Sequence, residues 1–134
     1  NSHMPKVLLE SDLPAIQLKK FIDEVDLENI GVLYDLGNAT AMGFDIESEL
    51  KLLYPLIEEV HIKDRYFNNG SSDRLGMANT SFDKAIKILK KSFWNGSLVL
   101  ETPVFDNWKD EAEANFSFTK NLVDSVTQNI ENRL

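Results

Sequence analysis

Short apolar runs recur four times along the chain, and segments long enough to form helices separate them. The runs are Val7-Leu8-Leu9-Glu10, Gly31-Val32-Leu33-Tyr34-Asp35, Glu59-Val60-His61-Ile62-Lys63 and Leu98-Val99-Leu100-Glu101. Runs with this spacing are typical of buried parallel strands that helical crossovers connect. We therefore predict strands over residues 6–10, 30–35, 58–63 and 97–101.

The segments between and after these strands carry apolar residues at helical spacing. Helices are predicted over residues 13–25, 45–56, 81–92 and 110–134. Ser11 or Asp12 is expected to cap the first helix, with Pro14 in its first turn. A Gly/Asn/Ala turn is expected after residue 35, and residues 64–80 form the longest irregular segment. The chain thus reads as one α/β domain over residues 5–134, a (βα)4 unit without an internal linker.

The length of the chain limits how such units are able to be arranged. Parallel strands with helical crossovers form either an open sheet or a closed barrel. A complete (β/α)8 barrel takes about 250 residues, whereas this chain has 134. We expect a small open sheet or half of a TIM barrel. A half-barrel leaves strand edges unpaired, so we expect either a missing N-terminal half or a homodimer or larger assembly that pairs those edges.

The composition of the chain argues against some classes of partner and some kinds of metal ligand. The net charge of −8 argues against a surface that follows a nucleic-acid backbone. No apolar stretch approaches the roughly 20 residues of a membrane-spanning helix. The chain has no cysteine, which fits a cytoplasmic protein and excludes thiolate metal ligands. Asn1-Ser2-His3-Met4 resembles the remnant of an expression tag, which leaves His61 as the histidine of interest.

Each predicted strand ends close to a side chain that is able to bind a metal. Glu10, Asp35, His61 and Glu101 occupy these positions, and the carboxyl ends of parallel strands are where such sheets bind ligands. On three of the strands the candidate shares a face with the apolar residue two positions earlier, whereas Glu59 precedes His61. Three carboxylates and one imidazole suit Mn²⁺ or Mg²⁺, with Co²⁺ or Zn²⁺ as alternatives.

The motifs around these residues resemble the C-terminal half of the xylose isomerase-like TIM barrels. The similar segments are Tyr34-Asp35-Leu36-Gly37-Asn38, Val60-His61-Ile62-Lys63-Asp64-Arg65, Leu75-Gly76 through Phe82, and Leu98-Val99-Leu100-Glu101. The superfamily includes sugar-phosphate isomerases and epimerases as well as family-2 AP endonucleases. The resemblance covers most of residues 6–125 and implies the fifth to eighth barrel strands with their helices.

The resemblance implies a role for each candidate. Glu10, Asp35, His61 and Glu101 match the family's metal ligands, and Glu10 and Glu101 match its acid/base pair. The implied reaction moves a proton next to a carbonyl of a small sugar or sugar phosphate, through an enediolate. One departure is Ala78, which stands where the family often has a second glycine after Leu75-Gly76.

Three further residues are candidate substrate contacts, each with a structural alternative. Lys63 either contacts a substrate hydroxyl or phosphate, or is a solvated strand end. Arg65 either clamps a phosphate with two hydrogen bonds or forms a salt bridge to an acidic residue. Asn38 either binds substrate or caps the turn.

Two other functions compete with the isomerase or epimerase. The isolated chain is alternatively a catalytically inactive half-barrel fragment or assembly module. An AP endonuclease-type phosphodiesterase is less favoured, because that class needs a histidine-rich multi-zinc cluster, with a histidine where this chain has Asn38.

Overall fold

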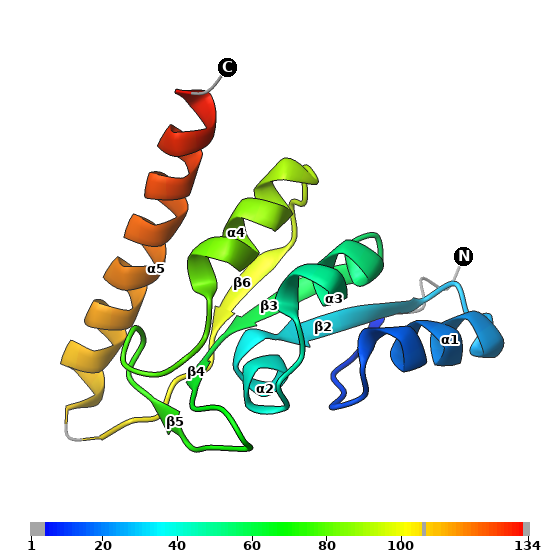
Figure 1. Cartoon of the computed structure of the whole chain (residues 1–134), viewed down its shortest axis with the longest axis horizontal. Helices are drawn as coiled ribbons and strands as arrows, with labels where there is room; N and C mark the ends of the chain where they lie inside the picture. The colour runs from blue at the N-terminus through cyan, green and yellow to red at the C-terminus, as the bar shows by residue number, and fades with distance from the viewer. Residues whose placement is uncertain (1–4, 106, 133–134) are drawn as a thin grey trace.

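The computed structural model describes residues 5–105 and 107–132, and its main sheet is the parallel one that the sequence predicts. The strands β1 (Val7–Leu9), β2 (Ile30–Asp35), β3 (Ile57–Ile62) and β6 (Ser97–Leu100) lie in the order β1-β2-β3-β6. Neighbouring strands are parallel throughout. A helix follows each of them, so the four predicted βα units are confirmed (Figure 1). The predicted tag remnant, residues 1–4, lies outside the described residues.

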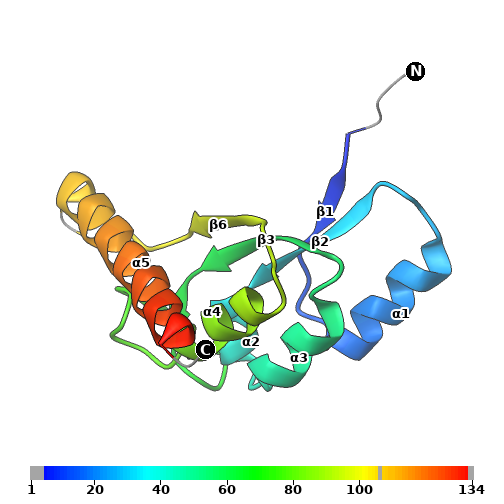
Figure 2. The ribbon, with the colours of Figure 1, turned by 90° about the horizontal axis from the view of Figure 1, so that it is seen from above.

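The helices cover one face of this sheet. These are α1 (Ala15–Val25), α3 (Ile46–Leu53), α4 (Phe82–Lys91) and α5 (Trp108–Glu131). Figure 2 shows α1, α3 and α4 side by side beneath the strands, with no described helix on the opposite face. The core lies between the layers and includes Leu18, Val32, Leu50, Val60, Ile62, Ile86 and Leu89. One covered face and one bare face are what half of a (β/α)8 barrel presents, because in the complete barrel the helices form only the outer ring.

The sheet has two free edges within the described residues. β1 pairs with β2 alone, and β6 pairs with β3 alone. A closed barrel has no such edges, since its first and last strands pair. The parallel half-barrel predicted from the sequence is therefore the architecture of this chain.

An irregularity in β3 determines which of its side chains lie on the bare face. Val32 pairs with Ile57 but Leu33 pairs with Glu59, so Glu58 is an extra residue in β3. Such a bulge changes the direction of neighbouring side chains and is common beside active sites. Because paired residues share a face, Glu59 lies on the same face as Leu33.

The sheet continues in this register toward its carboxyl edge, where Asp35 pairs with His61. Val60 and Ile62, which alternate with His61, are fully buried on the helix side. His61 therefore lies on the bare face with Glu59 and Asp35.

A short helix replaces the turn predicted after residue 35. α2 (Leu36–Ala41) begins because the Asp35 carboxylate accepts the backbone N–H of Asn38 at 2.8 Å. The Thr40 hydroxyl donates to the carbonyl of Leu36 at 2.8 Å within the same helix. Gly37 and Asn38 disfavour helix intrinsically, but the cap and the burial of α2 outweigh that preference.

The segment over residues 64–80 also contains structure that the sequence did not predict. β4 (Asp64–Arg65) and β5 (Ser72–Asp73) form a small antiparallel pair. Asn68 and Asn69 adopt positive φ in the loop between them, and asparagine tolerates this conformation better than most residues. The prediction of an irregular segment was therefore wrong for these four strand residues.

Several helix boundaries also differ from the prediction. α1 begins at Ala15 rather than residue 13, and neither Ser11 nor Asp12 caps it. Instead the Glu49 carboxylate on α3 accepts the N–H of Ala15 at 2.9 Å. α3 ends at Leu53, three residues early, and Asp45 caps its start by accepting the N–H of Ser48. A search of the described residues for a helix long and apolar enough to cross a membrane finds none.

Candidate metal centre

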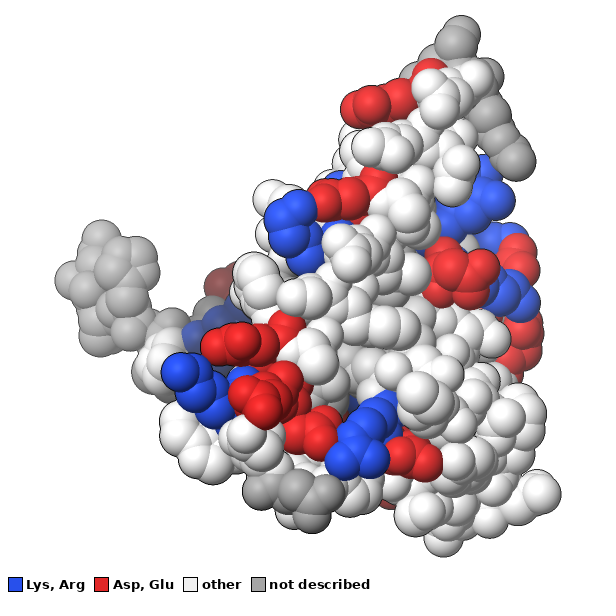
Figure 3. Space-filling model, turned by 90° about the vertical axis from the view of Figure 1, so that its left-hand side faces the viewer, with Lys and Arg blue, Asp and Glu red and all other residues white. Residues whose placement is uncertain are grey.

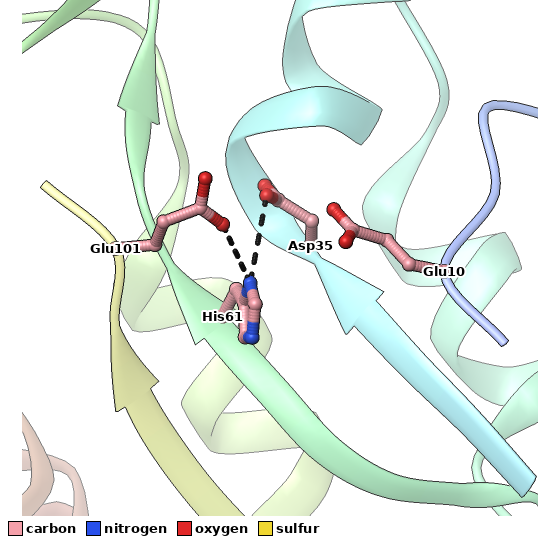
Figure 4. A group of neighbouring side chains, drawn as sticks. All are labelled: Glu10, Asp35, His61 and Glu101. Carbon is pink, nitrogen blue, oxygen red and sulfur yellow. Dashed lines mark hydrogen bonds and ion pairs between the residues drawn. The ribbon is translucent and has the colours of Figure 1, made fainter. Parts of the chain in front are cut away.

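The four predicted ligands come together at the carboxyl edge of the sheet. Glu10 follows β1, Asp35 ends β2, His61 lies in β3 and Glu101 follows β6. Figure 4 shows the four side chains pointing toward a common centre. One ligand atom from each lies within 4.8 Å of the ligand atoms of the other three. The register explains part of this closeness, since Asp35 is paired with His61 across β2 and β3.

The four side chains differ in their access to solvent. Asp35 is 2% exposed and His61 is 13% exposed, so these two form the floor of the cluster. The Glu101 side chain is 44% exposed, and Glu10 is also exposed. A small molecule approaching from solvent would therefore meet the two glutamates first.

Three carboxylates surround the His61 ring. Its Nδ1 is 2.6 Å from Glu101 Oε2 and 3.9 Å from Asp35 Oδ2. Its Nε2 is 3.2 Å from Glu59 Oε1. Glu59 was not among the predicted site residues, although its position two residues before His61 already placed it on the face of the ligands. The contact shows that this exception to the apolar pattern belongs to the site.

Lys63 supplies positive charge to the cluster. Its Nζ donates to Asp35 Oδ2 at 3.1 Å and to Glu101 Oε1 at 2.5 Å. The side chain is 16% exposed, so the alternative of a solvated strand end is wrong. Burial raises the pKa of Asp35, and the Asn38 N–H and Lys63 reduce this effect without cancelling it.

The contacts of Lys63 also affect the pKa of Glu101 and of the lysine itself. Burial would raise the pKa of Glu101, but hydrogen bonds from Lys63 and His61 outweigh it and lower that pKa. Burial would lower the pKa of Lys63, but its contacts with Glu101 and Asp35 outweigh it and raise that pKa. Glu101 and Lys63 therefore stabilise each other in their charged forms.

Asn38 and Arg65 extend the cluster on the side of Glu10. The amide nitrogen of Asn38 donates to Glu10 Oε1 at 3.2 Å, and its amide oxygen accepts from Arg65 Nη1 at 2.8 Å. The Arg65 guanidinium also donates to the Gly70 carbonyl and to Asn69 Oδ1. Among the described residues no acid pairs with Arg65, so the salt-bridge alternative is wrong. Asp35, rather than the Asn38 side chain, caps the turn.

A buried acid that sequence reasoning left without a role anchors the loop that follows β5. Asp64 is 1% exposed, and its carboxylate accepts the backbone N–H groups of Gly76, Ala78 and Thr80 at 2.8–3.0 Å. Ala78, the departure from the family's glycine, thus contributes an N–H that anchors the loop. An acid placed directly before a Gly/Ser/Asn-rich segment was the available signal.

The donor set fits a divalent cation. Hard cations bind oxygen at about 2.0–2.6 Å, so opposite ligands lie about 4–5 Å apart, and the 4.8 Å limit on this cluster matches that spacing. Three carboxylates and one imidazole are ligands that Mn²⁺ and Mg²⁺ accept, and zinc also binds such a set. The residues present are therefore able to form one metal site.

The charge around the molecule is mixed rather than uniformly basic. Figure 3 shows acidic and basic side chains next to one another in small groups, with uncharged surface between them. On this face the described residues form no continuous basic surface. A nucleic-acid backbone would find no extended track of positive charge there.

A comparison with protein families agrees with this geometry. The family model described as "Xylose isomerase-like TIM barrel" matches residues 14–122. The chain belongs to this family. The resemblance drawn from the motifs is thus confirmed, and the parallel sheet with its helical crossovers is the family's fold over half of a barrel. No curated protein sequence matches the chain significantly.

Solved structures of complete barrels show the same relation. A xylose isomerase domain protein from Planctomyces limnophilus has 20% identity and a TM-score of 0.76, with 92% of this chain covering 46% of that chain. For an L-ribulose 3-epimerase the identity is 16% and the TM-score 0.77, with coverages of 94% and 49%. The IOLI protein, solved with a bound zinc atom, has 20% identity, a TM-score of 0.69 and coverages of 83% and 44%.

These similarities concern the fold and its extent. All three identities are low, and the chain spans about half the length of the solved structures that it matches. By their names, one of these structures is an L-ribulose 3-epimerase and another contains a bound zinc atom.

Proposed function

We propose that this chain is the metal-binding half of a sugar or sugar-phosphate isomerase or epimerase. The observation that carries the proposal is the convergence of Glu10, Asp35, His61 and Glu101 within 4.8 Å at the carboxyl edge of the sheet. Structures named L-ribulose 3-epimerase and D-tagatose 3-epimerase-like protein share the fold, which supports a small sugar as the substrate class. Mn²⁺ or Mg²⁺ is the expected ion, with Co²⁺ or Zn²⁺ as alternatives.

Glu10 and Glu101 are proposed to move the proton. Both are exposed enough to meet a substrate, and their ligand oxygens lie within 4.8 Å of each other. One carboxylate would remove the proton from the carbon beside the carbonyl, and the resulting enediolate would receive a proton from the other. A bound divalent ion supplies Lewis-acid polarisation of that carbonyl. Two groups that exchange roles in this way permit epimerisation or, with proton return to the neighbouring carbon, isomerisation.

Lys63, Asn38 and Arg65 are proposed to contact the substrate. Lys63 lies against Asp35 and Glu101 and offers an ammonium donor beside the proton-transfer carboxylate. Arg65 is held by three neutral acceptors, so its charge is not neutralised by a described carboxylate. A guanidinium in that state suits the phosphate of a sugar phosphate.

The two free sheet edges make a partner part of this proposal. A second half-barrel would pair β1 and β6 and cover the bare face of the sheet. The partner is either a second copy of this chain or an N-terminal half of the barrel. Multi-angle light scattering with and without Mn²⁺ measures the mass of the protein in solution. A dimer supports a second copy of this chain as the partner, and a monomer contradicts it.

Exchange of a substrate proton with solvent tests the reaction. The chain would be incubated in D2O with Mn²⁺ and a panel of ketoses and ketose phosphates, and deuterium incorporation next to the carbonyl followed by NMR. We expect incorporation that EDTA abolishes and Glu101→Gln reduces at least 100-fold, with folding retained by circular dichroism. Glu28→Gln, at an exposed glutamate outside the ligand cluster, is the matched control. Metal binding without exchange on any substrate would favour the inactive half-barrel.

A further inference from the structure

The two ring nitrogens of His61 face different partners. Nδ1 faces the ligand cluster, 2.6 Å from Glu101 Oε2 and 3.9 Å from Asp35 Oδ2. Nε2 faces away from it, 3.2 Å from Glu59 Oε1. The ring itself is largely buried, with 13% of the side chain exposed. The position of the ring therefore makes Nδ1, rather than Nε2, available to a metal in the cluster.

A neutral imidazole is able to bind a metal only through the nitrogen that carries no proton. If Nδ1 binds the ion, the proton must be on Nε2, where it needs an acceptor. Glu59 Oε1 lies at hydrogen-bonding distance from that nitrogen. Carboxylates in this position orient the ring of a metal-binding histidine and raise its basicity.

The surroundings of Glu59 give its carboxylate no other described partner. Among the described residues, His61 is the side chain with which it forms a hydrogen bond or ion pair. Its neighbours in register are Leu33 on β2 and Ser97 on β6, neither of which carries charge. A partly buried carboxylate without a cationic partner costs stability unless it is hydrogen-bonded, so the contact with His61 is the physical reason for an acid at this position.

Alternation along β3 places Glu59 on the face of His61, two residues before it. The extra residue Glu58 sets the register with β2, in which Glu59 falls opposite Leu33. Glu58 itself pairs with Lys6 instead. Two adjacent glutamates on one strand thus have different partners, and one of them belongs to the metal centre.

We propose that Glu59 is a positioning residue for the metal centre. Its carboxylate accepts a hydrogen bond from the Nε2–H of His61 and thereby holds Nδ1 toward the ion. This inference rests on the metal site of the proposed function and adds a residue that acts through His61, not on the substrate. It predicts that metal affinity depends on Glu59 although its carboxylate is not a ligand.

Calorimetric titration with Mn²⁺ and with Zn²⁺ tests the dependence. Removal of such a partner weakens metal binding by about 10–100-fold, so Glu59→Leu is expected to raise Kd by this factor. Glu59→Gln keeps an oxygen acceptor and removes the charge, and is expected to retain binding within about tenfold. Glu58→Leu and Glu58→Gln make the same changes one residue away and are expected to leave Kd within twofold of the unsubstituted chain.

Nitrogen NMR of the zinc-bound chain gives a second readout that is independent of activity. The chain has two histidines, so His3→Gln leaves His61 as the source of imidazole signals. We expect a metal-shifted Nδ1 and a protonated Nε2 whose proton exchanges slowly with water. In Glu59→Leu the Nε2 proton should exchange too fast to observe, while circular dichroism shows the fold unchanged.

The outcomes separate this inference from the proposed function. If the unsubstituted chain binds neither Mn²⁺ nor Zn²⁺, the proposed metal centre fails, and the role of Glu59 fails with it. If the chain binds metal but Glu59→Leu binds equally well, the metal centre stands and the role of Glu59 is wrong. Zinc bound through Nε2, with the proton on Nδ1, would also overturn it.

Discussion

Gly37 and Lys63 are in direct contact where α2 passes the end of β3. A Cβ on Gly37 would lie 2.8 Å from the carbonyl oxygen of Lys63 and 2.8 Å from its Cγ. Both distances are shorter than real Cβ contacts, and one is to the backbone, which is unable to rotate away. The position therefore requires glycine for closeness of approach, and the contact helps to determine where the Lys63 side chain points.

Gly37→Ala is expected to destabilise the protein. Alanine in place of glycine within a helix ordinarily stabilises by about 1 kcal/mol, but overpacking against Lys63 costs about 1–3 kcal/mol. Urea unfolding should show a net loss of stability. A net gain would show that α2 moves away from β3 without cost.

Lys63→Met tests whether the ammonium compensates the buried acid in the absence of metal. Asp35 is 2% exposed, and Lys63 is its cationic partner at 3.1 Å. Leaving a buried charge unpaired costs about 3 kcal/mol, so the metal-free variant should be less stable by this order.

A divalent ion would replace the lost charge, so the deficit of Lys63→Met should shrink in Mn²⁺. Urea unfolding with and without Mn²⁺ measures both values. Lys84→Met is the control, since Lys84 pairs with the exposed acids Asp45 and Glu47. An equal deficit in both conditions would mean that Lys63 acts through packing alone.

Asp64→Asn should loosen the loop that follows β5. The substitution places an amide donor against three backbone N–H donors and leaves at least one of them without an acceptor. Each unsatisfied buried group costs about 1–3 kcal/mol. Hydrogen exchange should become faster at the amides of Gly76, Ala78 and Thr80, whereas Asp73→Asn in the same segment should leave them protected. Unchanged protection would contradict an anchoring role for Asp64.

Glu49→Gln should make the protein more stable at neutral pH. Burial raises the pKa of Glu49, the Ala15 N–H opposes this, and the charge of Asp45 adds to it. The folded state then holds the proton more tightly than the unfolded state, so stability falls as pH rises from the unfolded pKa through the folded one. Glutamine avoids this loss and still offers an oxygen to the Ala15 N–H.

The measurement is urea unfolding at pH 4 and pH 7. The stability of Glu49→Gln relative to the unsubstituted chain should increase between these values. Glu47→Gln on the same helix should show the opposite sign, because the Lys51 hydrogen bond and then Lys84 lower the pKa of Glu47. A carboxylate with a lowered pKa adds stability above its unfolded pKa, and that stability is lost as pH falls through the folded pKa. The same sign for both variants would show that neither pKa shift governs the result.

Local pattern was sufficient for most of the elements. The four strands appear close to where the apolar runs predict them, because a parallel barrel strand carries apolar residues both toward the helix layer and toward the barrel interior. α2 was missed because Gly37 and Asn38 are poor helix formers, and only the Asp35 cap and burial of the segment overcome this. The predicted start of α1 was wrong for a similar reason. The N–H of Ala15, the first residue of α1, donates to the Glu49 carboxylate of another helix rather than to a cap nearby in sequence.

The residues of the candidate site also fall into those that local pattern predicted and those that it missed. Glu10, Asp35, His61 and Glu101 were predicted because each lies near the carboxyl end of a strand, and parallel strands bring those ends to one edge. Asp64 was missed because its role depends on N–H groups 12 to 16 residues along the chain, and Glu59 because alternation shows a shared face but not a contact with His61 Nε2.

The sequence by itself determined the order of the strands and helices, the half-barrel extent and the residue types at the strand ends. The order of the elements and the residue types at the strand ends follow from local pattern, whereas chain length left an open sheet or a half-barrel, and the resemblance of the motifs implied the half-barrel. Only the tertiary structure decided that the Glu59 carboxylate contacts His61 Nε2, and that Lys63 bridges Asp35 and Glu101. The physical reason is that alternation fixes the face on which a side chain lies, whereas its contacts depend on the register between strands and on side-chain packing across the whole sheet.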